Sequence, residues 1–185
     1  SLGTGSVSVA STAVAKAKDI IGNTKGVKAL VIGAGEMSEL TIKHLLSSGF
    51  DVVLTSRDLK KAQNLAATFL KETTRAQETK IDVESYSELT NLLARIPVMI
   101  TATSAPYPII TKENAPSASI DRYWFDIAVP RDIDENISLS GLEIFSVDDL
   151  QDIVNENMSL RAEQAKTAYG IVSRMSLEFF EWLKS

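Results

Sequence analysis

Short apolar runs alternate with amphipathic stretches along most of this chain. The runs have the length and the Val, Ile and Leu content of buried strands, and between them apolar residues recur at helical spacing. Strands are predicted at Ala29–Ile32, Asp51–Thr55, Lys80–Val83, Val98–Ala102, Tyr123–Ile127 and Leu142–Phe145. Helices are predicted at Val7–Ile21, Met37–Leu46, Leu59–Lys71 and Glu88–Ala94. Such alternation requires crossover connections, so the pattern predicts an α/β fold with a doubly wound, mostly parallel sheet.

The last part of the chain departs from this alternation. From Asp149 to Lys184 there is no proline and only one glycine, Gly170, while apolar residues recur every three or four positions. A single helix of that length would run about 50 Å, which exceeds the width of a small domain. We therefore expect a long C-terminal connector helix that projects beyond the sheet. Two helices broken near Gly170 are the alternative.

Composition narrows the class of protein. The chain has 185 residues, enough for one ordinary domain, and its 44% hydrophobic and 23% charged content is that of a globular protein. A net charge of −5 argues against a chain built to grip nucleic acid. No apolar run approaches the roughly 20 residues that span a bilayer, so we expect no membrane partner. Cysteine is absent, which excludes disulfides and a cysteine nucleophile within this chain and suits a cytoplasmic location.

A glycine-containing turn, Gly33-Ala34-Gly35, stands between the first predicted strand and the following helix. Glycine lets the backbone turn sharply here, and a side chain at Gly35 would block a phosphate from the helix N-terminus, whose free N–H groups favour negative charge. Ser38 occupies the third motif position, which needs only a small residue. The context favours a Rossmann-type sheet that binds the pyrophosphate of a dinucleotide. A tight turn without a ligand is the alternative.

The end of the second strand indicates which dinucleotide is bound. NAD enzymes usually carry Asp or Glu there, whereas this chain has Thr55-Ser56-Arg57. A guanidinium supplies charge and a fork of donors for a 2′-phosphate, so NADPH is the expected cofactor. The next residue, Asp58, is placed to cap the following helix. The alternative is that Arg57 is an ordinary solvated surface residue.

Two further loops follow strands on the same side. One runs from Thr101 to Pro106 and is rich in small and hydroxyl residues, including Thr103 and Ser104, which we expect to lie against the ribose or nicotinamide. The other runs from Asp126 to Asp132. No Ser/His/Asp set or metal-ligand cluster is present in the sequence, so we assign no catalytic residue and no metal ligand. The single histidine, His44, falls inside a predicted helix, where a structural role is expected.

Several segments resemble one known family in order along the chain. They are VIGAGEMSEL, TSRDLKKAQNLA, TATSAPYPIIT, DIAVPRDID and SVDDLQDIVNENMSLR. Together they resemble the nicotinamide-binding domain of the glutamyl-tRNA reductase family, and the resemblance covers nearly the whole chain. It matches Gly33, Ala34, Gly35, Glu36, Met37 and Ser38 to the family's nucleotide turn and Ser56 with Arg57 to its usual Asn-Arg pair. Ser38 departs from a common glycine and Ser56 from a common asparagine.

The resemblance implies an organisation and an activity. Residues 1–26 would form an N-terminal helix and linker, 27–148 the NADPH-binding domain, and 149–185 the start of a spinal helix leading to a dimerisation domain outside this chain. A cysteine of a separate catalytic domain would attack glutamyl-tRNA, and NADPH would reduce the resulting thioester to glutamate-1-semialdehyde for haem (tetrapyrrole) biosynthesis. The full enzyme would be a homodimer, with a downstream aminomutase as a further partner, and the chain alone would be inactive.

Two other functions stay open from the residues. One is a self-sufficient NADPH-dependent dehydrogenase of the shikimate type, which would need its own substrate domain. The other is a non-enzymatic nucleotide-binding or dimerisation module that uses the long helix. Because the chain is acidic, we expect little affinity for tRNA in this chain by itself.

Overall fold

Six parallel strands form one sheet in a computed structural model that describes residues 4–71 and 80–184. The strands are β1 Lys28–Ile32, β2 Asp51–Thr55, β3 Ile81–Val83, β4 Val98–Thr101, β5 Arg122–Asp126 and β6 Leu142–Phe145. The helices are α1 Thr4–Ile21, α2 Glu36–Ser47, α3 Leu59–Lys71, α4 Leu89–Arg95 and α5 Val147–Lys184, with a 3-10 helix, η1, at Tyr86–Glu88. The strand order is β3-β2-β1-β4-β5-β6, so the predicted doubly wound sheet is confirmed.

The apolar runs form strands whose side chains are buried on both faces of the sheet. On one face Ala29, Val31 and Phe125 belong to a core completed by α1, α2 and α3. On the other face Leu30 and Trp124 pack with residues of α4 and of the loops that follow β4 and β5. Alternate residues of one strand thus enter opposite cores, and this is why these strands read as continuous apolar runs.

Most element boundaries agree with the prediction to within a few residues. The bounds of β2, α3 and β6 coincide with it. α1 begins at Thr4 rather than at Val7. The helix predicted at Glu88–Ala94 is α4, shifted by one residue, and it is preceded by a 3-10 helix, η1, that was not predicted; the hydroxyl of Ser85 accepts the Ser87 N–H and starts that turn.

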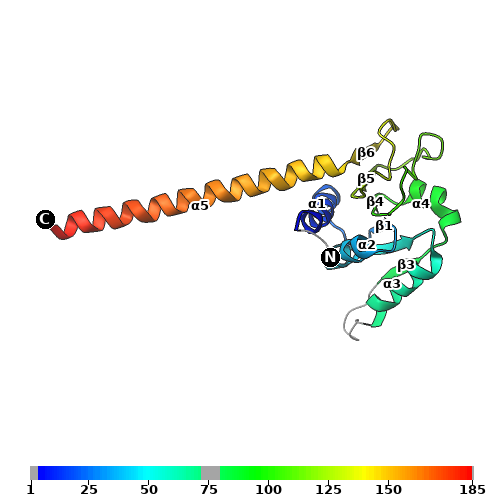
Figure 1. Cartoon of the computed structure of the whole chain (residues 1–185), viewed down its shortest axis with the longest axis horizontal. Helices are drawn as coiled ribbons and strands as arrows, with labels where there is room; N and C mark the ends of the chain where they lie inside the picture. The colour runs from blue at the N-terminus through cyan, green and yellow to red at the C-terminus, as the bar shows by residue number, and fades with distance from the viewer. Residues whose placement is uncertain (1–3, 72–79, 185) are drawn as a thin grey trace.

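The last helix is continuous and projects from the sheet (Figure 1). It comprises 38 residues, about 57 Å at about 1.5 Å per residue, and passes through Gly170 without ending, so the alternative of two helices is wrong. Leu150 and Val154 are buried against the body of the domain, whereas Met158 and Leu160 are 63% and 55% exposed. Among the described residues, no helix is both long and apolar enough to cross a membrane.

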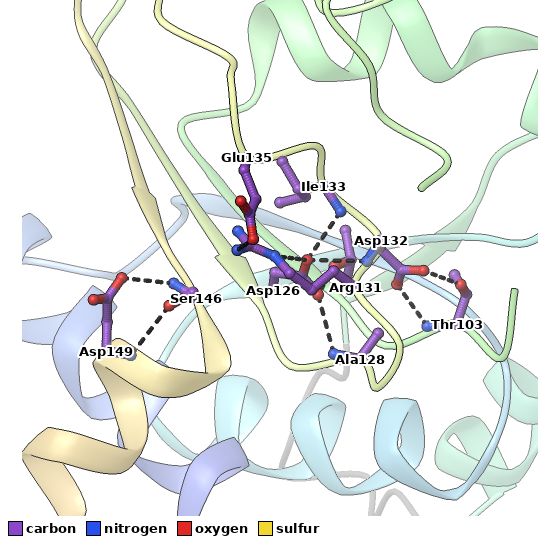
Figure 2. Close-up of polar contacts among 10 residues, drawn as sticks. Thr103, Asp126, Ala128, Arg131, Asp132, Ile133, Glu135, Ser146 and Asp149 are labelled. Carbon is purple, nitrogen blue, oxygen red and sulfur yellow. Dashed lines mark hydrogen bonds and ion pairs between the residues drawn. The ribbon is translucent and has the colours of Figure 1, made fainter. Parts of the chain in front are cut away.

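A reciprocal pair of hydrogen bonds starts α5. The N–H of Asp149 donates to the Ser146 hydroxyl at 3.1 Å, and the N–H of Ser146 donates to the Asp149 carboxylate at 2.9 Å (Figure 2). This capping box fixes the point at which the chain leaves β6 and enters the helix. The division into three parts at residues 26 and 148 stays a prediction.

Candidate nucleotide-binding site

The glycine turn follows β1 at the point between β1 and β4 where the strand order reverses, which is the switch point of the sheet. Gly33 has φ +118°, and a Cβ built there would lie 2.7 Å from the backbone oxygen of Ala102. No larger residue fits this close approach without moving the loop after β4. At Gly35 the backbone is extended and a Cβ would meet nothing within 4 Å. Gly33 is therefore needed for the fold, whereas Gly35 leaves open space in front of the helix.

The N-terminus of α2 has unpaired donors directed at that space. Gly35 is the N-cap and offers no side chain, so no side-chain hydrogen bond caps the helix. The first intrahelical bond runs from the Glu39 N–H to the Gly35 oxygen at 3.0 Å. The N–H groups of the first turn thus have no partner within the helix, and with the helix dipole they suit an anion.

Ser38 lies beneath the turn rather than in front of it. Its side chain is fully buried, and a Cβ on Gly33 would be 3.0 Å from the Ser38 hydroxyl oxygen. That hydroxyl has no hydrogen-bond partner among the described residues. The structure gives Ser38 the packing position that the third residue of the motif occupies.

A cavity of about 470 Å³ opens in front of the glycine turn. All the predicted contact residues except Ser38 line it, namely Gly33, Ala34, Gly35, Glu36, Met37, Ser56, Arg57, Thr103 and Ser104. Asp58, Lys61 and Tyr86, which the sequence reasoning did not include as contacts, line it too. Contact with a nucleotide stays a prediction for each of them, but the structure brings them to one cavity from four strand ends.

Two cationic residues, Arg57 and Lys61, lie in the segment that leads from β2 into α3. Asp58 caps α3 as predicted, because its carboxylate accepts the Lys61 N–H at 3.1 Å. The Ser56 hydroxyl accepts the Asp58 N–H at 3.2 Å, which keeps the segment compact. Arg57 and Lys61 then both line the cavity. The position of Lys61 in the first turn of the helix that follows Arg57 was the signal in the sequence that could have added it.

Tyr86 of η1 forms another part of the wall. It is half-buried, and burial raises the pKa of its phenol, with the positive charge of Arg57 acting in the opposite direction. The phenol is therefore neutral and able to donate at neutral pH. Tyr86 follows the short strand β3, and no spacing in the sequence marked it as a cavity residue.

The loop after β5 lies behind the cavity wall and does not line it. Asp126 is fully buried, and its carboxylate accepts the backbone N–H groups of Ala128, Asp132 and Ile133 at 2.9–3.1 Å (Figure 2). Burial raises the pKa of the Asp126 carboxyl, and the charge of Asp132 adds to the rise, whereas these backbone hydrogen bonds lower it. Arg131 lies 4.0 Å from Asp126 and pairs with Glu135 at 3.1 Å.

The remaining candidates for chemistry lie elsewhere. His44 is on α2 and does not line the cavity. Over residues 4–71 and 80–184, no three His, Asp or Glu side chains are grouped so as to hold a metal ion.

Residues 15–153 match the shikimate/quinate 5-dehydrogenase family. The chain is 80% identical over its whole length to the glutamyl-tRNA reductase of Aliarcobacter butzleri, of which it covers 41%. It is 49% identical over 97% of its length to that of Wolinella succinogenes and covers 39% of that protein. Among solved structures, the glutamyl-tRNA reductase of Methanopyrus kandleri superposes with a TM-score of 0.72 and 29% identity, over 87% of this chain and 40% of that one.

The fold, the cavity at its switch point and this match together define a nicotinamide-nucleotide-binding domain. The chain belongs to the shikimate/quinate 5-dehydrogenase family. Within that family its resemblance to the nucleotide-binding domain of glutamyl-tRNA reductase is confirmed. The chain spans about 40% of the length of these curated relatives.

Proposed function

We propose that this chain is the NADPH-binding domain of a glutamyl-tRNA reductase. The observation that carries the proposal is the cavity that joins an uncapped helix N-terminus to two cations at the end of β2. The curated relatives bear that enzyme's name, which supports the proposal. The residues present fit the cofactor, because the uncapped N–H groups of α2 suit its pyrophosphate and Arg57 and Lys61 suit its 2′-phosphate.

The residues of the chain would divide the binding between them. The N–H groups at the start of α2 suit a pyrophosphate, and the open space at Gly35 lets it approach. Arg57 and Lys61 supply the charge that a 2′-phosphate needs and that a bare ribose does not. The Glu36 carboxylate also lines the cavity and opposes anions, so the cations after β2 have to outweigh it.

When bound, NADPH supplies a hydride. In the full-length protein this hydride would reduce a glutamyl thioester, derived from glutamyl-tRNA, to glutamate-1-semialdehyde for tetrapyrrole biosynthesis. The thioester would form on a cysteine outside this chain, since the chain has none. The same proposal includes a homodimeric full-length protein in the cytoplasm, an aminomutase as downstream partner and weak binding of tRNA by this chain alone.

A titration tests the choice of cofactor. Replacing Arg57 with Ala removes charge-assisted hydrogen bonds to a 2′-phosphate, so NADPH affinity should fall about 10- to 100-fold while NADH affinity changes less than about twofold. Arg95→Ala is the matched control, because Arg95 is an exposed arginine at the end of α4 that does not line the cavity. Equal affinities of the unaltered chain for NADPH and NADH would contradict the role of Arg57.

A second measurement tests the reaction. The full-length protein should form the aldehyde from glutamyl-tRNA and NADPH, and Arg57→Ala should raise the KM for NADPH more than it lowers kcat. The 185-residue chain should oxidise no NADPH with glutamyl-tRNA or with a small ketone. Oxidation with a small ketone would instead favour the self-sufficient dehydrogenase, and absence of any nucleotide binding would favour the non-enzymatic module.

A further inference from the structure

Thr103 lines the cavity, but its hydrogen-bond donors are already used. Its backbone N–H donates to one carboxylate oxygen of Asp132 at 2.9 Å, and its hydroxyl donates to the other (Figure 2). The same hydroxyl accepts the Ala105 N–H at 3.3 Å. A threonine hydroxyl has one hydrogen to donate, so none is left for a ligand. Thr103 is thus a fixed part of the cavity wall, and its neighbour Ser104 is exposed.

Asp132 ties the loop after β4 at both of its ends. Its carboxylate takes the donors of Thr103, and its backbone oxygen accepts the N–H groups of Ile109 and Ile110 at 2.8 and 3.0 Å. The loop between these anchors therefore has its two ends fixed to one residue that follows β5. Asp132 does not line the cavity, but through these bonds it sets the position of the wall that Thr103 and Ser104 form.

Asp132 is itself held in place by the carboxylate of Asp126. It is fully buried, and its own N–H donates to the Asp126 carboxylate at 3.0 Å. Asp126 also accepts the Thr101 hydroxyl at 3.2 Å, so the ends of β4 and β5 are joined by the same carboxylate. A buried carboxylate with this many donors is rigid, because breaking any one bond leaves an unpaired polar group.

The segment that Asp132 holds abuts the glycine turn. A Cβ on Gly33 would lie 2.7 Å from the backbone oxygen of Ala102, so the loop packs closely against the turn. A loop released from Asp132 would change the width of the cavity between Gly33 and Ser104. The side of the cavity at Arg57 and Lys61 is built from β2 and α3 and does not depend on this contact.

We propose that Asp132 is a positioning residue of the nucleotide cavity, which holds Thr103 and Ser104 against the part of the dinucleotide beyond the adenosine 2′-phosphate. The proposal rests on the proposed function. Asp132 touches no ligand and acts through Thr103, so its effect should be confined to ligands that reach the loop after β4. A full dinucleotide would reach that loop, whereas adenosine 2′,5′-bisphosphate would extend only from Arg57 to the N-terminus of α2, where its 5′-phosphate would lie.

The test compares these two ligands on the 185-residue chain. Asp132→Asn keeps the size of the side chain but sets an NH2 group against one of the donors of Thr103. NADPH affinity should fall about tenfold, because one or two hydrogen bonds of the wall are lost, while adenosine 2′,5′-bisphosphate affinity changes less than about twofold. Thr103→Val should have the same selective effect, and Thr103→Ser, which keeps the hydroxyl, should bind NADPH more tightly than Thr103→Val.

Each result decides the matter. Unchanged NADPH affinity in a folded Asp132→Asn chain, or equal weakening of both ligands, would overturn the positioning role. If circular dichroism shows that the Asp132→Asn chain is unfolded, the two Thr103 variants provide the test. Equal NADPH affinities of Thr103→Val and Thr103→Ser would overturn the proposal. A loss of NADPH affinity in Thr103→Val without a loss of adenosine 2′,5′-bisphosphate affinity would support it. Failure of the unaltered chain to bind either ligand would show instead that the proposed function is wrong.

Discussion

At the scale of single residues, the two glycines of the turn differ in what they do. Gly33 has a positive φ and no room for a Cβ, whereas Gly35 has an extended backbone and open space. Gly33→Ala should therefore destabilise the fold by roughly 2 kcal/mol or more, since strain in such a backbone costs about 1–3 kcal/mol before the clash with Ala102 is added. Urea unfolding followed by circular dichroism measures this.

Gly35→Ala is the matched substitution. It should change the free energy of unfolding by less than about 1 kcal/mol, because the new methyl group meets no protein atom. The methyl group instead enters the space through which a pyrophosphate would approach, so NADPH affinity should fall. A Gly35→Ala chain that binds NADPH normally would show that the ligand does not lie against this turn.

At the scale of elements, the start of α5 depends on the capping box of Ser146 and Asp149. Ser146→Ala removes the acceptor for the Asp149 N–H and should lower the free energy of unfolding by about 1 kcal/mol. Ser159→Ala is the control on the same helix, because Ser159 is exposed in the helix interior, where Ala is the better helix former. Equal effects of the two substitutions in urea unfolding would mean that the cap contributes nothing.

The sheet shows which parts of an element a sequence can specify. β2 and α3 were predicted with their observed bounds, because a strand buried on both faces and a helix with one apolar side have different periods. η1 was missed, since it is a single 3-10 turn before the predicted helix and is started by one hydroxyl, that of Ser85. A local side-chain hydrogen bond of this kind leaves no periodic signal.

At the scale of the whole molecule, the folded body ends within the first turns of α5. Leu150 and Val154 are buried, whereas residues 155–168 are exposed. A chain that stops after Asn157 should therefore melt within about 3 °C of the full chain. A chain that stops after Ser146 loses the burial of two large side chains, about 1.5–3 kcal/mol each, and should melt several degrees lower. Equal melting temperatures for the two shortened chains in scanning calorimetry would contradict this boundary.

The sequence by itself determined the class of the fold, the place of the cavity and two of its charged residues, Glu36 and Arg57. Apolar runs between amphipathic helices specify a doubly wound sheet, and the glycine turn and Arg57 follow strands whose carboxyl ends must meet at one edge. These features depend on residues near one another in the chain, so a pattern can reveal them.

Only the tertiary structure decided what the side chains do at that edge. Ser38 is buried beneath the turn, Tyr86 joins the wall from η1, and Thr103 gives its donors to Asp132, which lies 29 positions further on. The loop after β5 follows a strand on the same side as the cavity but does not line it. Contacts between loops that follow different strands depend on how the strands are ordered and packed, and no local spacing encodes that arrangement.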